Sequence, residues 1–259
     1  MLNACVAHRG WSGLAPENTL AAIKLAVEDG LIEMIEIDVQ LSKDGIPVVI
    51  HDFTLDRTTN GTGHVKDTML CELVTYDAGS WFAPAFAGEK IPTLEEVLCL
   101  VKGRKKLNIE LKQVGELYPF MEMKVLQLIQ EFDLQDEVVV TSFDQQCLQK
   151  VKATAPEIAV GLIVGRPPVT IEQLQALGAK FLAIDYSYIT KSMVQEFFDQ
   201  GIDIMAWTIN DKESMKKIMN LHPFIRICTN HPEVWKCAIK EGGMEGGMGT
   251  FRLASQTQK

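Results

Sequence analysis

A predicted hairpin early in the chain brings together the residue types that metal binding and acid–base catalysis need. Glu36 and Asp38 are two positions apart, so a β-strand would point both carboxylates to one face. Asp44 and Gly45 are typical of a hairpin turn, after which an apolar run returns to His51. If the two arms pair symmetrically about this turn, His51 lies opposite Asp38 on the same face, whereas a shift of one residue would reverse its side. The grouping indicates a hard-metal or acid–base site, with a solvated acidic edge hairpin as the alternative.

Other polar side chains end or interrupt strand-like apolar runs in the same way. His8 and Arg9 follow the apolar run 5–7, and Glu110 and Lys112 alternate with apolar residues. Three further candidates stand at the ends of later runs, namely Asp185, Trp207 and Asn210. Each has a structural alternative, because a core histidine, a same-face ion pair, a helix cap or a core tryptophan would give the same local pattern. Their joint occurrence at predicted strand ends favours a single functional site.

The combined side chains indicate a particular chemistry. Carboxylates without thiolates favour Mg²⁺ or Ca²⁺ over Zn²⁺ as a bound metal. The three carboxylates are those of Glu36, Asp38 and Glu110. A metal ion beside Arg9 and Lys112 would suit an anionic phosphate oxygen, and His8 with His51 would provide a proton acceptor and a proton donor. This set matches cleavage of a phosphodiester.

A regular alternation of strands and helices must position these residues. The predicted strands cover residues 5–8, 34–42, 107–112, 138–141, 158–164, 181–185, 204–209 and 225–228, and residues 48–51 form the return arm of the hairpin. Strands that alternate with helices predict a parallel sheet, and eight such units in about 240 residues predict a closed TIM (β/α)8 barrel. A barrel of this kind gathers its reactive groups at the carboxyl ends of its strands. No glycine-rich phosphate loop follows the first strand, which argues against a dinucleotide-binding fold.

Polar N-caps followed three residues later by Glu or Gln mark the expected helix starts. The caps expected on this pattern are Thr93, Ser142, Thr170, Asn210 and Asn230. Residues 53–90 break the alternation and are too long for an ordinary loop, so we expect a small inserted subdomain after the hairpin. Residues 1–241 would then form one barrel domain, and the glycine-rich residues 242–259 are expected to form a loosely ordered, flexible tail.

The composition limits the possible classes of protein. The chain has 259 residues, of which 47% are hydrophobic, and no apolar run reaches the ~18 residues that a membrane-spanning helix needs. A net charge of -9 without a basic stripe disfavours nucleic-acid binding, so an anionic small-molecule substrate would need local positive charge. The 6 cysteines lack C-x-x-C spacing and are expected to be reduced thiols in a cytoplasmic protein, and no secretory signal is expected. The oligomeric state stays open.

Several motifs together resemble the glycerophosphodiester phosphodiesterase family in its bacterial, cytosolic form. They are His8-Arg9-Gly10, Pro16-Glu17-Asn18-Thr19, Glu36-x-Asp38, His51-Asp52, Asp56-Arg57-Thr58-Thr59-Asn60-Gly61-Thr62-Gly63, Ile91-Pro92-Thr93-Leu94-Glu95-Glu96, Ile109-Glu110-Leu111-Lys112 and Trp207-Thr208-Ile209-Asn210. The likeness covers roughly residues 4–235. It is most specific in the first half, where several rare motifs occur in order.

The resemblance implies hydrolysis of deacylated phospholipids, such as glycerophosphocholine or glycerophosphoethanolamine, to glycerol 3-phosphate and an alcohol. It implies that the three carboxylates hold the metal and that His8 and His51 are the acid–base pair. It further implies that Arg9 and Lys112 bind the phosphate and that Trp207, with Phe residues of the insertion, flanks the glycerol.

One departure from the family pattern occurs near the end of the last predicted strand. Asn230 stands where the family usually has aspartate. Because asparagine caps a helix about as well as aspartate, we expect a preserved cap with one negative charge fewer at the barrel mouth.

Two other functions remain open at this stage. A lysophospholipase D-like or sphingomyelinase D-like diesterase would need apolar surface at the barrel mouth. Trp81, Phe82, Phe86 and Ile91 could supply it, although we expect them to form the small core of the insertion. A non-catalytic barrel that binds glycerophosphodiesters is the second alternative, and the complete set of histidines and carboxylates argues against it.

Overall fold

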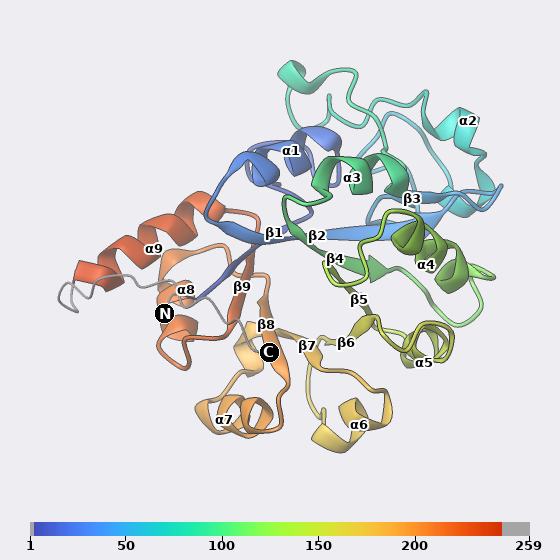
Figure 1. Cartoon of the computed structure of the whole chain (residues 1–259). Coiled ribbons are helices and arrows are strands. Elements are labelled where there is room, and N and C mark those ends of the chain that lie inside the picture. The colour runs from blue at the N-terminus through green and yellow to red at the C-terminus, as the bar shows by residue number, and fades with distance from the viewer. Residues whose placement is uncertain (1–2, 245–259) are drawn as a thin grey trace.

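The structure, a computed structural model, describes residues 3–244, and within them nine strands form one sheet. The strands are β1 Cys5–His8, β2 Ile32–Leu41, β3 Pro47–Val49, β4 Lys106–Leu111, β5 Val138–Ser142, β6 Ala159–Val164, β7 Phe181–Asp185, β8 Asp203–Trp207 and β9 Arg226–Thr229. All except β3 are parallel, and they close into a barrel because β1 pairs with both β2 and β9. The predicted TIM barrel is therefore confirmed (Figure 1).

Helices surround the barrel and connect its strands (Figure 1). They are α1 Leu20–Glu28, α2 Leu70–Leu73, α3 Leu94–Val101, α4 Met121–Glu131, α5 Gln145–Thr154, α6 Ile171–Ala176, α7 Lys191–Asp199, α8 Lys212–Met219 and α9 Pro232–Met244. Short 3₁₀ segments lie at η1 Val65–Asp67, η2 Pro84–Phe86 and η3 Tyr186–Tyr188. The helices pack their apolar faces on the outside of the barrel and bury a continuous core there.

The expected helix caps are partly correct. Thr93 and Thr170 each form a complete capping box. The prediction was wrong for α5 and α8, which are capped by Asp144 and Asp211. Ser142 instead donates its hydroxyl to the carbonyl of Leu111, and Asn210 accepts from the backbone N–H of Asn230. These contacts with neighbouring strands outweigh the local helix-start pattern.

The pairing of the early hairpin differs from the predicted register by one residue. Val39 pairs with Val49, which places Ile50 rather than His51 opposite Asp38. The reason is the turn: Ser42 N–H donates to the carbonyl of Ile46 at 3.0 Å, so the loop has three residues and is centred on Asp44. A loop of this length needs a left-handed residue, which is Gly45 with φ +75°.

Strand β3 takes the place of β1 on one edge of β2. β1 pairs with the first half of β2 as far as Glu36, while β3 pairs with residues 39–41 at its far end. At Val39 the opposite edge of β2 is occupied by β4, so β1 and β3 share the same edge. Because β3 is antiparallel, its end runs toward the end of β1. The residues that follow the two strands, including His51 and Arg9, therefore meet.

Residues 53–91 form a small unit with its own apolar cluster. The cluster comprises Val48, Ile50, Leu55, Val65, Leu73, Ala78 and Ile91. The expectation that Trp81, Phe82 and Phe86 belong to this core was wrong, whereas Ile91 does belong to it. Trp81 is 40% exposed, and the three aromatic rings pack edge to face in a row.

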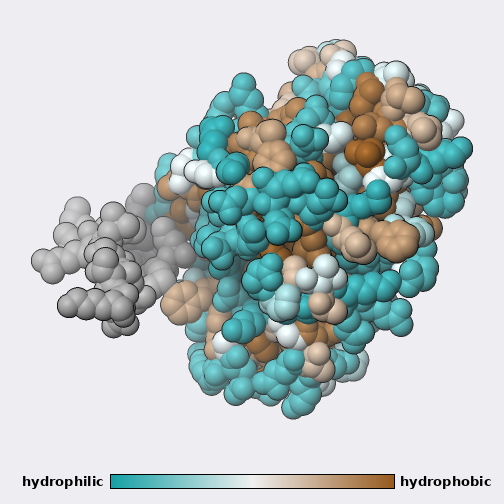
Figure 2. All heavy atoms as spheres, turned by 45° about the vertical axis from the view of Figure 1, so that its right-hand side comes forward, coloured by the Kyte–Doolittle hydropathy of each residue, from teal (hydrophilic) through white to brown (hydrophobic). Residues whose placement is uncertain are grey.

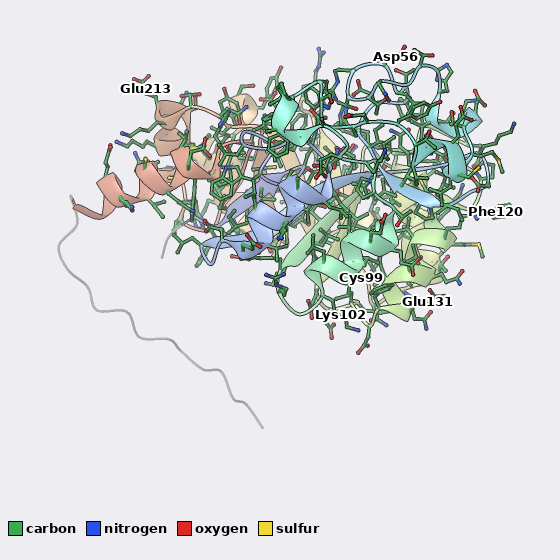
Figure 3. All side chains as sticks on the ribbon, turned by 90° about the horizontal axis from the view of Figure 1, so that it is seen from above. Asp56, Cys99, Lys102, Phe120, Glu131 and Glu213 are labelled. Atoms are coloured by element: carbon green, nitrogen blue, oxygen red, sulfur yellow. The ribbon has the colours of Figure 1, made fainter. Side chains whose placement is uncertain are left out.

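The two ends of the barrel are distinct (Figure 3). Asp56 of the insertion and Glu213 in α8 lie on one side of the molecule, and Lys102 after α3 lies on the opposite side. On the face shown in Figure 2, hydrophilic residues predominate and hydrophobic ones are interspersed among them.

Within residues 3–244, none of the helices has the length and apolar character needed to cross a membrane. Helix α9 extends three residues into the expected tail, whose remainder, residues 245–259, lies outside the described residues.

Candidate active site

The alternation of strand side chains carries the polar candidates into the barrel. One end of the interior is filled by an apolar cluster that includes Val6 and Met34. Two positions further along β1 and β2 stand His8 and Glu36, which therefore point to the same interior. Asp38 follows after two more positions. The strand period of two thus separates an apolar layer from a polar layer at the carboxyl ends of the strands.

A cavity of about 210 Å³ opens at this polar layer. The predicted residues that line it are His8, Arg9, Glu36, His51, Glu110, Lys112 and Trp207. Asp38 lies behind this wall and is 1% exposed. The cavity is also lined by residues that were not predicted from the sequence, namely Asn108, Phe143, Ile163, Ala183, Met205, Thr208 and Cys228. Asn108 could have been found, because it precedes Glu110 by two positions in a predicted strand.

Three carboxylates form the acidic part of the site. Glu36, Asp38 and Glu110 each offer one oxygen, and these atoms lie within 4.8 Å of one another. Burial and repulsion from Asp38 and Glu110 raise the pKa of Glu36, and burial with the charge of Asp38 raises the pKa of Glu110 to about 7. Within residues 3–244 the buried Oε1 of Glu36 has no hydrogen-bond partner. An oxygen-only cluster with an unsatisfied carboxylate oxygen and mutual repulsion fits a divalent cation such as Mg²⁺ or Ca²⁺.

Two cationic side chains balance the carboxylates. Lys112 Nζ lies 2.7 Å from Glu110 Oε1 and 3.6 Å from Asp38 Oδ1. Arg9 Nε lies 3.3 Å from Asp38 Oδ2, and the backbone N–H of Arg9 donates to Glu36 at 2.9 Å. Burial by itself would raise the pKa of Asp38, but Arg9 and Lys112 outweigh it and hold this pKa below its ordinary value. Asp38 is therefore the member of the cluster that stays ionised.

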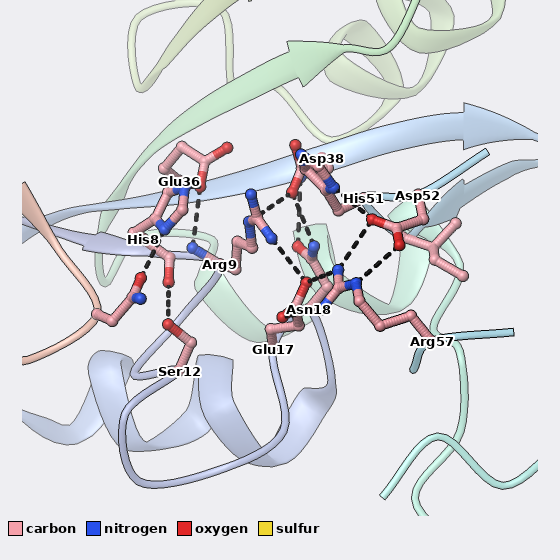
Figure 4. Close-up of polar contacts among 12 residues, drawn as sticks. His8, Arg9, Ser12, Glu17, Asn18, Glu36, Asp38, His51, Asp52 and Arg57 are labelled. Carbon is pink, nitrogen blue, oxygen red and sulfur yellow. Dashed lines mark hydrogen bonds and ion pairs between the residues drawn. The ribbon is translucent and has the colours of Figure 1, made fainter. Parts of the chain in front are cut away.

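Asn18 gives Asp38 a further partner. Its side-chain amide donates to Asp38 Oδ2 at 2.8 Å, and its Oδ1 accepts the Asp38 backbone N–H at 3.3 Å (Figure 4). Asn18 has φ +59°, a left-handed conformation that asparagine tolerates better than most residues. Asn18, in the loop after β1, thus holds Asp38 in place through an uncharged side chain.

His51 reaches the site even though the predicted register was wrong. The strand pairing ends before it, and Gln40 holds the turn that follows by donating its amide to the carbonyls of Ile50, His51 and Asp52. Nδ1 of His51 lies 2.6 Å from Asp52 Oδ1. Hydrogen bonds from Arg57 hold the pKa of Asp52 far below its usual range, so Asp52 is an acceptor and Nδ1 carries the proton. Nε2 is left free to exchange a proton with a substrate.

His8 has a different partner behind it. Its Nδ1 lies 2.6 Å from Oδ1 of Asn230, and its Nε2 lies 3.9 Å from Glu36 Oε2. Burial, assisted by the charge of Arg9, lowers the pKa of His8 to about 4. Asn230 was expected to cap α9, but its side chain contacts His8, and the backbone N–H groups of Val234 and Trp235 bond to the carbonyl of His231. An amide oxygen that accepts Nδ1–H leaves Nε2 of His8 facing the carboxylates.

An aromatic pair borders the cavity. The rings of Trp207 and Phe143 meet edge to face with centroids 6.0 Å apart. Phe143 is 50% exposed and follows the end of β5. The phenyl ring in the cavity wall is thus Phe143 and not one from the insertion, whose Phe residues are absent from the described lining.

Two of the sequence candidates do not belong to the cavity wall. Asp185 accepts the backbone N–H and the hydroxyl of Ser187 and so caps the 3₁₀ turn η3. Asn210 links β8 to β9 through Asn230 and the hydroxyl of Thr229. Asp185 has the capping role that was considered as its alternative, whereas Asn210 has a structural role between two strands.

Comparison with known proteins gives a consistent result. The chain matches the model of the glycerophosphoryl diester phosphodiesterase family over residues 8–234. It is 40% identical over 245 residues to the glycerophosphodiester phosphodiesterase of Caldanaerobacter subterraneus subsp. tengcongensis. The matched region covers 94% of this chain and 100% of that relative. It is 32% identical over 256 residues to a glycerophosphodiester phosphodiesterase of Bacillus subtilis. This match covers 92% of this chain and 86% of that relative.

A solved structure agrees with the sequence relatives. The phosphodiesterase of Oleispira antarctica, in complex with the product sn-glycerol-3-phosphate, superposes with a TM-score of 0.87 at 37% identity. The match covers 92% of this chain and 97% of the Oleispira chain.

The barrel and its polar end define the class of the protein as a TIM-barrel hydrolase. Because the family model spans nearly the whole chain and the relatives are covered almost completely, this chain belongs to the glycerophosphoryl diester phosphodiesterase family. It is therefore a phosphoric diester hydrolase, as the motif resemblance predicted.

Proposed function

We propose that the protein hydrolyses glycerophosphodiesters, such as glycerophosphocholine or glycerophosphoethanolamine, to glycerol 3-phosphate and an alcohol. The observation that carries this proposal is a single cavity lined by two imidazoles, two cationic side chains and two carboxylates of a three-carboxylate cluster. The Oleispira relative, whose structure contains sn-glycerol-3-phosphate, supports the same class of small-molecule ligand.

The charged residues divide into two groups in this proposal. Glu36, Asp38 and Glu110 hold a divalent cation, Mg²⁺ or Ca²⁺, which when bound neutralises phosphate charge as a Lewis acid. Arg9 and Lys112 bind the phosphate oxygens through charge-assisted hydrogen bonds. Arg9 and Lys112 both line the cavity, so they supply local positive charge for an anion in a net acidic chain.

The two histidines perform the proton transfers. His51 is backed by the charged Asp52, which stabilises an imidazolium, so we assign to His51 the acceptance of the proton from the nucleophile. His8 is the second member of the pair, at the neighbouring strand end. The nucleophile is either water or the 2-hydroxyl of the substrate, and the second route would pass through a cyclic phosphate. Trp207, paired with Phe143, provides an apolar wall for the glycerol carbons.

A coupled assay for released glycerol 3-phosphate tests this function. Glycerophosphocholine with Mg²⁺ or Ca²⁺ should give product, and an excess of chelator should abolish its release. Full activity in excess chelator would contradict the metal assignment. An assay for released choline on lysophosphatidylcholine and sphingomyelin separates the lysophospholipase D-like and sphingomyelinase D-like alternatives, because these cleavages free choline and leave a lipid phosphate in place of glycerol 3-phosphate. Cleavage of lipid-bearing diesters alone would favour them. Tight binding of glycerophosphocholine without turnover would instead indicate a non-catalytic barrel.

A further inference from the structure

Arg57 of the insertion bridges two carboxylates at the edge of the site (Figure 4). Its Nε and one terminal nitrogen donate to the two oxygens of Asp52 at 2.7 and 2.9 Å. Both terminal nitrogens donate to the two oxygens of Glu17 at 2.8 and 2.7 Å. The guanidinium therefore uses two of its edges, each in a bidentate pair. One side chain thus connects the segment after β3 with the loop after β1.

The two bridged carboxylates continue to the residues that face the cavity. Glu17 Oε1 accepts from a terminal nitrogen of Arg9 at 2.8 Å, and Asp52 Oδ1 lies 2.6 Å from His51 Nδ1. These side-chain contacts form one continuous network, in the order His51, Asp52, Arg57, Glu17, Arg9. Its two ends are the proposed proton acceptor and the proposed phosphate ligand, which lie on different segments of the fold.

The bidentate pairs of Arg57 act on orientation as well as on stability. The side chain of Arg57 is 44% exposed, so solvent screens its ion pairs and reduces their contribution to the free energy of unfolding. The bidentate contacts also fix directions, because a planar guanidinium holds each carboxylate in one orientation. With Asp52 held in place, its Oδ1 fixes Nδ1–H of His51. With Glu17 held in place, its Oε1 fixes a terminal nitrogen of Arg9, whose Nε lies 3.3 Å from Asp38 Oδ2.

We propose that Arg57 is a positioning residue that sets the orientations of His51 and Arg9 together, and so couples the inserted subdomain to catalysis. The inference rests on the proposed roles of His51 and Arg9. Arg57 itself does not line the cavity in the described part of the chain, so it acts through its two carboxylate partners and not by contact with the substrate.

Two substitutions separate orientation from charge. Arg57→Gln removes the charge and the planar guanidinium, while Arg57→Lys keeps the charge but cannot form both bidentate pairs. Misorientation should lower kcat of Arg57→Gln by about 10- to 100-fold while KM changes by less than about threefold. Arg57→Lys should recover only a small part of kcat. Arg226→Gln is the matched control, since Arg226 pairs with Asp203 and Glu33 away from the cavity and its loss should leave kcat unchanged.

A second measurement reports on geometry without turnover. Nitrogen-15 NMR of the imidazoles should show His51 of the wild type as the Nδ1–H tautomer and His51 of Arg57→Gln as a mixture of tautomers. If the wild type is active and Arg57→Gln retains its kcat, or if Arg57→Lys restores kcat fully, the positioning role is wrong. If the wild type releases no glycerol 3-phosphate, the proposed function fails, and an unchanged tautomer in Arg57→Gln would separately overturn this inference.

Discussion

The two histidines of the site differ in the side chain that supports each of them. Behind His51 is the ionised Asp52, and behind His8 is the neutral amide of Asn230. A carboxylate partner favours the protonated ring, whereas an amide oxygen orients the ring without adding charge. Burial lowers the pKa of both imidazoles, to about 4 for His8, whereas the hydrogen bond to Asp52 opposes this effect at His51. His51 is therefore the better suited of the two to accept a proton. The aspartate usual in the family at position 230 would reduce this difference.

At the residue scale, we predict that His51→Ala abolishes turnover while the fold stays intact. Loss of the proton acceptor should lower kcat by about 10²–10⁴-fold, the range typical of a missing acid–base group. The assay for glycerol 3-phosphate release, together with circular dichroism, checks both parts. His64→Ala is the control, because His64 is exposed and lies in the insertion. Equal kcat for both variants would remove His51 from the mechanism.

Metal affinity should depend on pH in a defined direction. Protons compete with the metal at Glu110, whose pKa is raised to about 7, and at Glu36, whose pKa is also raised. Affinity should therefore increase as the pH rises from about 6 toward 8 and these carboxyls ionise, by up to about tenfold per pH unit for each proton displaced. Calorimetric titrations with Mg²⁺ and Ca²⁺ measure this slope.

A variant and the stability curve supply the corresponding controls. Glu110→Gln should bind metal more weakly and show a shallower pH slope, since one competing proton is gone. In the metal-free protein, the raised pKa of Glu110 means that this residue favours the folded state only while its carboxyl group is protonated. This contribution to stability is fully present below the unfolded-state pKa of the carboxyl and is lost as the pH rises through about 7. Metal-free Glu110→Gln should therefore gain stability relative to the wild type toward pH 8. A pH-independent metal affinity would contradict the assignment of these ligands.

At the scale of elements, the β2–β3 hairpin positions its return arm through Gln40, which stands two positions beyond Asp38 in β2. Gln40 is fully buried and donates to the carbonyls of Ile50, His51 and Asp52 at 2.9, 3.0 and 2.7 Å. Its Oε1 accepts the hydroxyl of Tyr118 at 2.6 Å. These bonds replace the strand pairing that stops at Val49. The amide of Gln40 thus holds the backbone around His51, while Asp52 holds its ring.

We predict that Gln40→Met destabilises the protein and lowers kcat together. The substitution keeps the volume but leaves buried carbonyls unsatisfied, which should cost about 1–3 kcal/mol of unfolding free energy. Urea unfolding and steady-state kinetics provide the two measurements. Tyr118→Phe removes only the bond to Oε1 and should affect kcat much less. If Gln40→Met kept the kcat of the wild type, the segment after β3 would be held by other contacts.

At the scale of the whole molecule, two apolar cores lie outside the barrel interior, in addition to the cluster that fills one end of that interior. The main core joins the helices to the outside of the barrel, and a smaller cluster lies beneath the insertion. The insertion supplies Arg57, and its cluster includes Val48 and Ile50 at the approach to His51. The local stability of the insertion should therefore control the site without controlling the barrel.

This arrangement predicts different effects for two leucine substitutions. Leu73→Ala in the small cluster should lower the opening free energy of residues 53–91 by about 2–5 kcal/mol while the barrel strands keep their protection. Leu182→Ala in β7 should instead destabilise the barrel, since Leu182 is fully buried in the main core. Native-state hydrogen exchange distinguishes the two patterns, and Leu73→Ala should also lose activity. Uniform loss of protection in Leu73→Ala would mean that the two cores unfold as one unit.

Much of the barrel and most of the candidate site could be predicted from the sequence because they depend on local periods. The alternation of strands with helices predicted the fold, and the spacing of two between Glu36 and Asp38 predicted a shared face. His8, Arg9, Glu110 and Lys112 were found because polar residues at the ends of apolar strands are unusual. Residues without such a signal were missed, and Phe143 is an example, since an aromatic residue after a strand has many ordinary explanations.

Only the tertiary structure decided which of these residues meet and how they are held. Asn230 contacts His8 across a separation of 222 positions, and this contact exists because β9 and β1 are neighbours in the closed barrel. The hairpin register depended on a three-residue loop, and the placement of His51 depended on Gln40 and Asp52. Likewise, Arg57 joins Glu17 to Asp52 only because the insertion folds back over the loop after β1. Residue types and their spacing determined which functional groups were available, whereas closure of the barrel determined how those groups are oriented toward one another.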